Sequence, residues 1–358
     1  MSKKPFILGI ESSCDETAAS IISENDQGNP VVLSNIVSSQ EDIHKKFGGV
    51  VPELAARSHI EKIDWIVQRA INDSGININE LDAVASTAGP GLIVCLSVGL
   101  SFGKAVAASL NKPFIAVNHL EGHALSPKLN SELKYPYLLL LISGGHTQYL
   151  SVNNLSKYKR LGTTIDDAIG EAFDKTAKTL GIEFPGGPQI EILAKKGNPH
   201  KYNLPKPIYN KGGCNLSFAG LKTSILKIAK KIKTDQEKFD LAASFQRTVI
   251  EILHKKTKIA FTEFENQFKP KEKKFIIAGG VAANKEIRNM LINLCYEHKY
   301  NPIFPPIEFC GDNAAMIAMV GLEKYKKGKF SELSHPAIPR WSLDEKAAFL
   351  KGAGVKLN

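Results

Sequence analysis

Short apolar runs separated by polar turns dominate the first 120 residues and predict the strands of a buried sheet. The pattern predicts strands at residues 6–11, 18–22, 31–37, 81–88 and 114–117. Apolar residues at helical spacing predict a helix through Ile63, Ile66, Val67 and Ala70, and a second helix is expected at 97–110. Strands that alternate with helices in this way indicate an α/β fold.

A second cycle of the same kind begins near residue 137. The apolar strand 138–142 leads into Ser143-Gly144-Gly145, much as the first strand leads into Glu11-Ser12-Ser13, and a hairpin-like return follows both. A later strand at 275–278 leads into Gly279-Gly280. Phosphates commonly bind at such turns, where backbone N–H groups converge. We therefore expect two similar α/β halves with a cleft between them.

The second half also contains signals for helix ends. Thr164 is expected to begin a helix, with Asp167 completing a capping box and Gly181 ending it. The predicted apolar stripe of this helix is Ile165, Ala168, Ile169 and Ala172. Asn284 is expected to cap a helix with the stripe Ile287, Met290, Leu291 and Leu294. Residues 187–213, rich in Pro, Gly and Lys, are expected to form an irregular insertion.

Composition places the chain among ordinary globular proteins. Its 358 residues suit two linked cores, and 43% are hydrophobic and 23% charged. No apolar run approaches the roughly 20 residues of a membrane span, and the N-terminus shows no secretory signal. The sequence thus predicts a cytoplasmic protein without membrane segments. The five scattered cysteines form no Cys-x-x-Cys, so we expect buried free thiols.

The chain is basic, with a formal net charge of +10. Lysines gather at residues 227–233, 255–258, 269–274 and 324–329. Such runs are often only solvated helix faces, but the summed field also attracts a polyanion, of which tRNA is one example.

His119 and His123 lie four residues apart, so on a helix both imidazoles project from one face. This spacing suits two ligands of one Fe²⁺ or Zn²⁺ ion, although two ordinary core or surface histidines show it as well. The zincin motif is excluded, because Glu121 lies midway between the histidines and not beside the first. Asp312 is a candidate third ligand, or else an N-terminal cap of the helix that follows it.

Several familiar catalytic patterns are missing. The spacing of Gly99, Gly103 and Lys104 is one residue short of a P-loop, and no Gly-x-Gly-x-x-Gly follows a strand. Ser143 lacks the preceding glycine of a nucleophile elbow. Asp15 and Glu16 lie just after the first strand, a position that suits a general base or a ligand of a metal-bound water, or else they are plain turn residues.

Eight motifs in order carry a family resemblance. They are GIESSCDET (9–17), HLEGH (119–123), LISGGHTQ (141–148), IDDAIGEAFDK (165–175), PGGP (185–188), NLSFAGLK (215–222), GGVAAN (279–284) and FCGDN (309–313). In these motifs the chain resembles the bacterial TsaD family of tRNA N6-adenosine threonylcarbamoyltransferases, once called glycoproteases.

The resemblance implies an actin-like ATPase fold, as in sugar kinases and Hsp70, with two duplicated subdomains around a cleft. We expect subdomains at residues 1–130 and 131–325 and a C-terminal segment at 326–358. The implied metal ligands are His119, His123 and Asp312. The implied substrate contacts are Leu141, Ile142, Ser143, Gly144, Gly145, Asp174, Gly187, Glu191 and Asn284, and the family usually has aspartate where this chain has Glu191.

The resemblance also implies the reaction. The N6 amine of the adenosine at position 37, next to the anticodon of ANN-decoding tRNAs, would attack L-threonylcarbamoyladenylate and release AMP. One Fe²⁺ per subunit, or Zn²⁺, would assist, and Asp15 or Glu16 would be the base. A TsaB-like paralogue, forming a heterodimer, and a TsaE-like ATPase would be partners. The alternatives are O-carbamoyl transfer to a small molecule and a non-catalytic partner subunit. A metalloprotease is disfavoured, because the general base that such an enzyme needs beside the first histidine is missing from this sequence.

Overall fold

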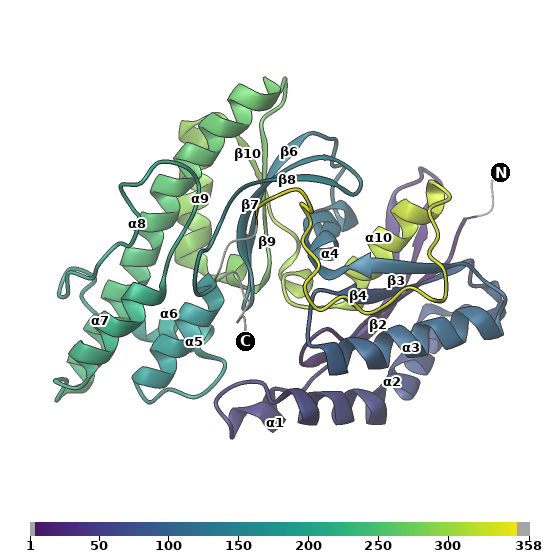
Figure 1. Ribbon diagram of the computed structural model, residues 1–358, viewed down its shortest axis with the longest axis horizontal. Coiled ribbons are helices and arrows are strands. Elements are labelled where there is room, and N and C mark those ends of the chain that lie inside the picture. Colours follow the sequence, from purple (N-terminus) through teal and green to yellow (C-terminus); the bar gives the residue numbers. More distant parts are fainter. Residues whose placement is uncertain (1–3, 349–358) are drawn as a thin grey trace. The chain divides into compact units, whose positions relative to one another are not determined.

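The computed structural model describes residues 4–348 and divides the chain into two compact units. The first unit contains the described residues up to Lys134 together with the later segment Pro305–Glu345. The second contains Tyr135–Phe304 and residues 346–348. Each unit has its own five-stranded sheet (Figure 1).

In the first unit, the sheet has the order β3-β2-β1-β4-β5. Its strands are β1 (Ile7–Glu11), β2 (Glu16–Glu24), β3 (Pro30–Ser39), β4 (Ala83–Gly89) and β5 (Phe114–Asn118). The chain forms the antiparallel meander β1-β2-β3 and then adds β4 and β5 parallel to β1. All five predicted strands are present, with ends that differ from the prediction by one or two residues on most of them.

Helices cover both faces of this sheet (Figure 1). The helical segments are α1 (Glu41–Lys45), α2 (Pro52–Ser74), η1 (Ile78–Glu80), α3 (Ile93–Ser109), α4 (His119–Leu125), η2 (Ser126–Leu129), η4 (Ile307–Phe309) and α10 (Ala314–Lys326). Helices α2 and α3 pack on one face and share an apolar core with it. Helix α10 packs on β1, β2 and β4 and also contacts α4.

Two glycines let α10 approach the first sheet closely. A Cβ on Gly9 would lie 2.5 Å from the Ala314 carbonyl oxygen, and one on Gly321 would lie 2.6 Å from the Ala85 Cβ. Gly99 and Gly103 do the same for α3, where a Cβ would meet Ser12 and Ser86. The P-loop-like spacing of these last two glycines therefore serves helix–sheet packing.

The second sheet has the order β10-β9-β6-β7-β8. Its strands are β6 (Tyr137–Ile142), β7 (Thr147–Asn154), β8 (Lys157–Thr163), β9 (Lys274–Ala278) and β10 (Asn301–Ile303). The helical segments of this unit are α5 (Ile169–Thr179), α6 (Gly186–Ala194), α7 (Ala219–Ala229), α8 (Asp235–Phe268), η3 (Gly280–Ala283) and α9 (Lys285–Glu297). These helices and one face of the sheet enclose a second core.

Both sheets are built in the same way. An antiparallel meander, β6-β7-β8, is again followed by two parallel strands: β9 pairs with β6, and β10 pairs with β9. The duplication predicted from the sequence is therefore confirmed.

The domain division differs from the expected one. Helix α10 belongs to the first unit because it packs on the first sheet, and the chain beyond it stays in that unit as far as Glu345. Ser331 N–H donates to the Phe114 carbonyl at 2.8 Å, and Ile338 N–H to the Ala88 carbonyl at 2.7 Å. The expected boundary at 325/326 and a separate segment 326–358 are thus not found. Residues 1–3 and 349–358 of the expected divisions lie outside the described residues.

Two local predictions are wrong. Helix α5 begins at Ile169 and not at Thr164, because Thr164 forms a β-bridge with Leu216 and the Ile165 N–H donates to the Leu216 carbonyl. Part of the expected irregular segment 187–213 is helix α6. By contrast, Gly181 has the expected positive φ of 69°, and Asn284 caps α9 as predicted.

Four of the five cysteines are buried and Cys14 is half-buried, and all are free thiols. Within residues 4–348, no helix combines the length and the apolar character that crossing a membrane requires.

Candidate functional site

The two histidines lie on helix α4, which begins directly after strand β5. Asn118 ends the strand and caps the helix, since its side-chain oxygen accepts from the Leu120 N–H at 2.9 Å. His119 is therefore the first helical residue, and His123 follows one turn later. Their rings lie edge to face, with centroids 4.8 Å apart, and both side chains are buried.

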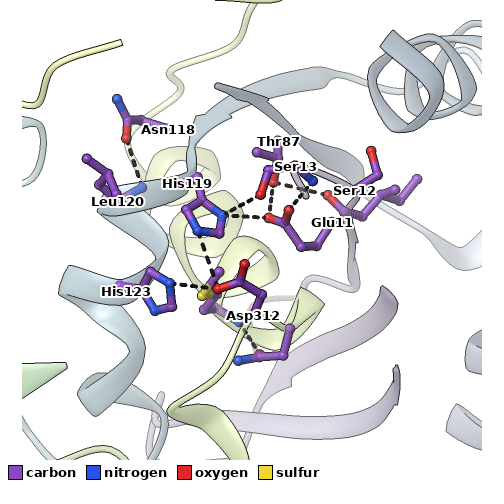
Figure 2. A network of polar contacts seen from close by, with 12 residues as sticks. Glu11, Ser12, Ser13, Thr87, Asn118, His119, Leu120, His123 and Asp312 are labelled. Carbon is purple, nitrogen blue, oxygen red and sulfur yellow. Dashed lines mark hydrogen bonds and ion pairs between the residues drawn. The ribbon is translucent and has the colours of Figure 1, made fainter. Parts of the chain in front are cut away.

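Asp312 comes from a distant part of the sequence and lies beside both rings (Figure 2). Its Oδ1 is 3.0 Å from His123 Nε2 and 3.5 Å from His119 Nε2. The alternative that Asp312 merely caps the next helix is wrong, because Asn313 caps α10 by accepting from the Met316 N–H at 3.0 Å. Asp312 is thus left to face the histidines.

These three residues fit a divalent cation. Their ligand atoms lie within 4.8 Å of one another. Metal–ligand bonds of about 2.1 Å at angles between octahedral and tetrahedral require ligand atoms roughly 3.0 to 3.5 Å apart, and both measured separations from Asp312 lie in that range. Two imidazoles and one carboxylate are a donor set suited to Fe²⁺ or Zn²⁺.

Charge in this region favours a positive centre between the rings. Burial opposes protonation of His119, but the carboxylates of Asp312 and Glu11 outweigh it and raise the pKa of His119 well above its ordinary value. Burial likewise disfavours the Asp312 anion, yet His119 and His123 hold the pKa of Asp312 well below its usual range. A bound cation would satisfy the same two carboxylates.

Asp15 and Glu16 lie in the same unit, where the chain turns from β1 into β2. Burial, followed by the charges of Asp312 and Asp15, raises the pKa of the Glu16 carboxyl well above its ordinary value. The turn is held from outside, because Gln40 N–H donates to the Asp15 carbonyl at 3.0 Å. The charge of Asp312, one of the candidate metal ligands, thus acts on the Glu16 carboxyl.

The predicted substrate contacts all lie in the second unit, starting with the turn after β6. Ser143 N–H donates to the His146 carbonyl at 2.8 Å, and the Ser143 hydroxyl oxygen accepts from the His146 N–H at 3.1 Å. The turn is tied to helix α5 by the Gly170 N–H, which donates to the Ser143 carbonyl at 3.2 Å. Gly144 and Gly145 are exposed with open space beside them, whereas Leu141 and Ile142 are buried.

Asp174 joins helix α5 to the start of helix α6. Its Oδ1 accepts from the Gly186 N–H at 2.8 Å. A Cβ on Gly186 would lie 2.4 Å from the Ala177 Cβ, so only glycine allows this approach. Gly187, the next residue, has open space on its side. Asp174 is thus a structural link as well as a predicted substrate contact.

Glu191 and Asn284 meet at the start of helix α9. The Glu191 Oε1 accepts from the Lys285 N–H at 3.2 Å, and Asn284 Oδ1 accepts from the Ile287 N–H at 3.0 Å. The longer glutamate thus reaches an amide at the N-terminus of α9. The Asn284 amide donates to the buried oxygen of Gln246, on α8, at 3.0 Å.

These bonds gather the turn 143–145 and the first turns of α5, α6 and α9 into one region of the second unit. Backbone N–H groups at helix N-termini attract anions, and phosphate groups in particular. Since Asp174 and Glu191 already accept from the first amides of α6 and α9, the exposed Gly144 and Gly145 are the better candidates for contact with a phosphorylated ligand.

Sequence reasoning missed two residues of these sites, Glu11 and Gln246. Glu11 is fully buried and lies 3.0 Å from His119 Nδ1. A charged residue that ends an apolar strand is the signal that could have drawn attention to it. Gln246 lies within a helix that we did not predict, and nothing in its local sequence distinguishes it.

Comparisons with known proteins agree with the motifs. The family model described as "TsaD: tRNA N6-adenosine threonylcarbamoyltransferase" matches residues 31–319. A protein of that name from Pelagibacter ubique (strain HTCC1062) is 75% identical over 357 residues, covering 100% of both chains. Another from Caulobacter vibrioides is 48% identical and covers 98% of this chain and 95% of the relative.

Solved structures at low identity share the fold. HypF from T. kodakarensis, 14% identical, superposes with a TM-score of 0.60 over 94% of this chain and 50% of its own. Component A of the (R)-2-hydroxyglutaryl-CoA dehydratase of Acidaminococcus fermentans is also 14% identical. It superposes with a TM-score of 0.50 over 90% of this chain and 98% of its own. Both have the actin-like ATPase fold, and the predicted fold class is confirmed.

Proposed function

Because this chain belongs to the TsaD family, the tRNA N6-adenosine threonylcarbamoyltransferases, we propose how its own residues carry out that transfer. The enzyme is an acyltransferase that acts on an adenosine of tRNA. The N6 amine attacks the carbamoyl carbon of L-threonylcarbamoyladenylate, the bond from that carbon to the phosphate oxygen breaks, and AMP leaves. The acceptor is the adenosine at position 37 of ANN-decoding tRNAs.

In the proposal, the adenylate binds to the second unit. In the turn Ser143–Gly145, which follows the buried strand residues Leu141 and Ile142, the exposed Gly144 and Gly145 offer backbone N–H groups to its oxygens. Asp174, Gly187, Glu191 and Asn284 contact the nucleoside. The support is their common location: hydrogen bonds join the glycine turn and helices α5, α6 and α9 into one region of the second unit, in which Gly144 and Gly145 are exposed. AMP binding to the purified chain tests this assignment directly.

The proposed metal ligands are His119, His123 and Asp312, which would hold one Fe²⁺ or Zn²⁺. When bound, the ion supplies Lewis acidity and neutralises phosphate charge. The observation that carries this assignment is the separation of the facing nitrogen and oxygen atoms, 3.0 and 3.5 Å, in a buried cluster. Removal of both histidines in His119→Ala/His123→Ala should abolish metal binding by elemental analysis, and a folded double variant that keeps its metal would refute the assignment.

Glu16, with Asp15 beside it, is the proposed base for the N6 proton. An exocyclic amine is a weak nucleophile and benefits from proton removal as the new bond forms. A carboxylate whose pKa is raised accepts a proton more readily, and burial and the nearby Asp312 and Asp15 charges raise the pKa of Glu16. In Glu16→Gln, transfer should fall while AMP binding in the second unit stays unchanged.

The family resemblance further supports a TsaB-like paralogue as heterodimer partner, a TsaE-like ATPase and a cytoplasmic location, where tRNA is modified. Partner dependence is tested by multiple-turnover assays. A purified chain that modifies tRNA at a rate no partner increases would contradict it.

The transfer itself is tested in cells and in vitro. After depletion of the protein, total tRNA is digested and threonylcarbamoyladenosine is measured by mass spectrometry, and its loss is expected. The wild-type gene should restore the nucleoside, and a Glu16→Gln gene should restore less. An undiminished nucleoside after complete depletion would overturn the assignment.

A further inference from the structure

Glu11 is a fully buried carboxylate at the end of strand β1 that the proposed chemistry does not use. A buried anion is tolerated only where donors satisfy its oxygens. Glu11 Oε1 accepts from the Ser13 N–H at 2.5 Å, and Oε2 accepts from the Thr87 hydroxyl at 2.5 Å. The third group is the ring of His119, whose Nδ1 lies 3.0 Å from Oε2 (Figure 2).

The sheet itself fixes where this carboxylate lies. Strands β1 and β4 pair parallel, with Ile10 beside Ser86, so Glu11 and Thr87 are the next positions along the two strands. The Thr87 hydroxyl therefore holds the carboxylate from the sheet side, independently of the histidine.

This contact determines the state of His119. A carboxylate can only accept hydrogen bonds, so His119 Nδ1 must carry a proton and donate it in the hydrogen bond to Glu11. The Ser13 hydroxyl oxygen, 3.2 Å from Nδ1, lies close to the same proton. The other nitrogen, Nε2, then points at Asp312 Oδ1, 3.5 Å away.

His123 has no comparable support. Its Nε2 lies 3.0 Å from Asp312, but its buried Nδ1 has no hydrogen-bond partner among the residues that the structure describes. The two histidines are therefore held unequally: the sheet orients His119, whereas Asp312 orients His123.

We propose that Glu11 is a positioning residue for the metal centre, which fixes the tautomer and ring orientation of His119 and makes Nε2 a stronger ligand. This inference rests on the proposed metal site of His119, His123 and Asp312. The β1–β4 pairing fixes the position of Glu11, and Glu11 in turn fixes the orientation of the His119 ring. A carboxylate behind a ligand histidine raises its basicity, and loss of such a partner typically lowers metal affinity about 10- to 100-fold.

The test measures Zn²⁺ affinity of the full chain by competition with a chromophoric chelator, together with the visible absorption spectrum of the Co²⁺-loaded protein. Glu11→Gln keeps an oxygen that can accept from Nδ1 but removes the charge, and Glu11→Ala removes both. We expect Glu11→Gln to bind one Zn²⁺ about 10- to 100-fold more weakly with an altered Co²⁺ spectrum, and Glu11→Ala to lose more.

Asp166→Asn is the matched control. Asp166 is also a carboxylate held by backbone N–H groups, of Phe218 and Ala219, but it lies in the second unit. It should bind Zn²⁺ as the wild type does. If Glu11→Ala does not fold, the isosteric glutamine variant still decides the question.

The outcomes separate the two ideas. Wild-type affinity and an unchanged Co²⁺ spectrum in Glu11→Gln would overturn the role of Glu11 while the metal site stands. A wild-type chain that binds neither Zn²⁺ nor Co²⁺ would overturn the metal site and, with it, this inference.

Discussion

At the scale of single residues, the predicted substrate contacts also have structural roles. Asn284 caps α9 with its oxygen and donates its amide hydrogen to the buried Gln246. Asp174 binds the first amide of α6. Substituting either one therefore changes the local structure as well as any ligand contact, and the two effects have to be separated by the choice of variant.

Asn284→Ala should lower the free energy of unfolding measurably. Loss of the cap costs about 1 kcal/mol, and the unpaired Gln246 oxygen adds roughly 1 kcal/mol or more. Asn284→Asp keeps a capping oxygen, and Gln246 can turn its amide to donate, so stability should change little while AMP affinity falls. Urea unfolding and calorimetry with AMP measure the two quantities. Wild-type AMP affinity in Asn284→Asp would argue against a nucleoside contact.

His59 is a buried histidine that supports the turn before Asp15. Its Nε2–H donates to the Cys14 carbonyl at 3.0 Å, and its Nδ1 accepts from the Thr17 hydroxyl at 2.7 Å. The amide nitrogen of Gln40, which can only donate, lies 3.3 Å from the same Nδ1, so Nδ1 carries no proton and the ring is neutral. The neutral imidazole thus contacts Cys14 and Thr17, the residues on either side of Asp15 and Glu16.

Acid should therefore destabilise the first unit through His59. Burial lowers the pKa of His59; the Cys14 carbonyl, Glu11 and Asp15 favour its protonation without offsetting burial, and Lys62 opposes it. The folded pKa lies below the unfolded value of about 6.5, so stability is unaffected above that pH and is lost as pH falls below it. Unfolding free energies between pH 8 and 5 should fall less steeply for His59→Gln, and equal slopes would contradict this.

At the scale of elements, two partly buried ion pairs hold helix α4 and the segment η2 that follows it against helix α10. Lys324 Nζ lies 3.1 Å from Glu121 Oε2, and Lys128 Nζ lies 2.8 Å from Glu323 Oε2. Helix α4 carries both histidines, and Asp312 stands just before α10. The glutamate in the middle of the His-Leu-Glu-Gly-His motif thus aligns the two ligand-bearing elements.

Lys324→Met should destabilise the chain by about 3 kcal/mol or more, because it removes the cation beside the buried Glu121 carboxylate. Adding Glu121→Gln should recover part of that loss, since the buried negative charge is then removed together with its cation. Exposed Lys329→Met is the control and should stay within about 0.5 kcal/mol of wild type. Chemical denaturation measures all three variants, and an equal loss in the single and double variants would exclude this explanation.

At the scale of the whole molecule, the net charge is +10, and the lysine clusters that contribute to it differ in how many of their lysines form ion pairs. In the cluster at 324–329, Lys324 forms an ion pair with Glu121, and Lys326 forms one with Glu24. In the cluster at 227–233, by contrast, the lysine side chains are exposed around the end of α7. The second cluster is therefore the better candidate for contact with tRNA phosphates.

Changing Lys227, Lys230 and Lys231 to Gln should weaken tRNA binding and flatten its salt dependence. Each lost phosphate contact should reduce the slope of log affinity against log salt by about 0.7 for single-stranded RNA. Hydrolysis of the adenylate without tRNA should barely change. Lys327→Gln/Lys329→Gln is the comparison, and binding titrations at several salt concentrations decide. Unchanged slopes in both variants would place the tRNA path elsewhere.

The sequence by itself determined the class of the fold. Apolar runs and helical spacing report whether successive side chains are buried, and burial follows the local period of a strand or helix. The five strands of the first unit, the repeat beginning near residue 137 and the Asn284 cap were therefore predictable. So was the common face of His119 and His123, which needs only one turn of helix.

Tertiary structure decided everything that depends on distant partners. Thr164 carries a good local capping signal, yet its bridge to Leu216, 52 residues away, moved the helix start to Ile169. Asp312 meets His123 across 189 residues, and Glu11 meets His119 across 108. Local patterns contain no information about such pairs. The packing of helix α10 on the first sheet, through Gly9 and Gly321, sets where Asp312 lies, and the strand order β1-β4-β5 within that sheet brings Glu11 beside His119.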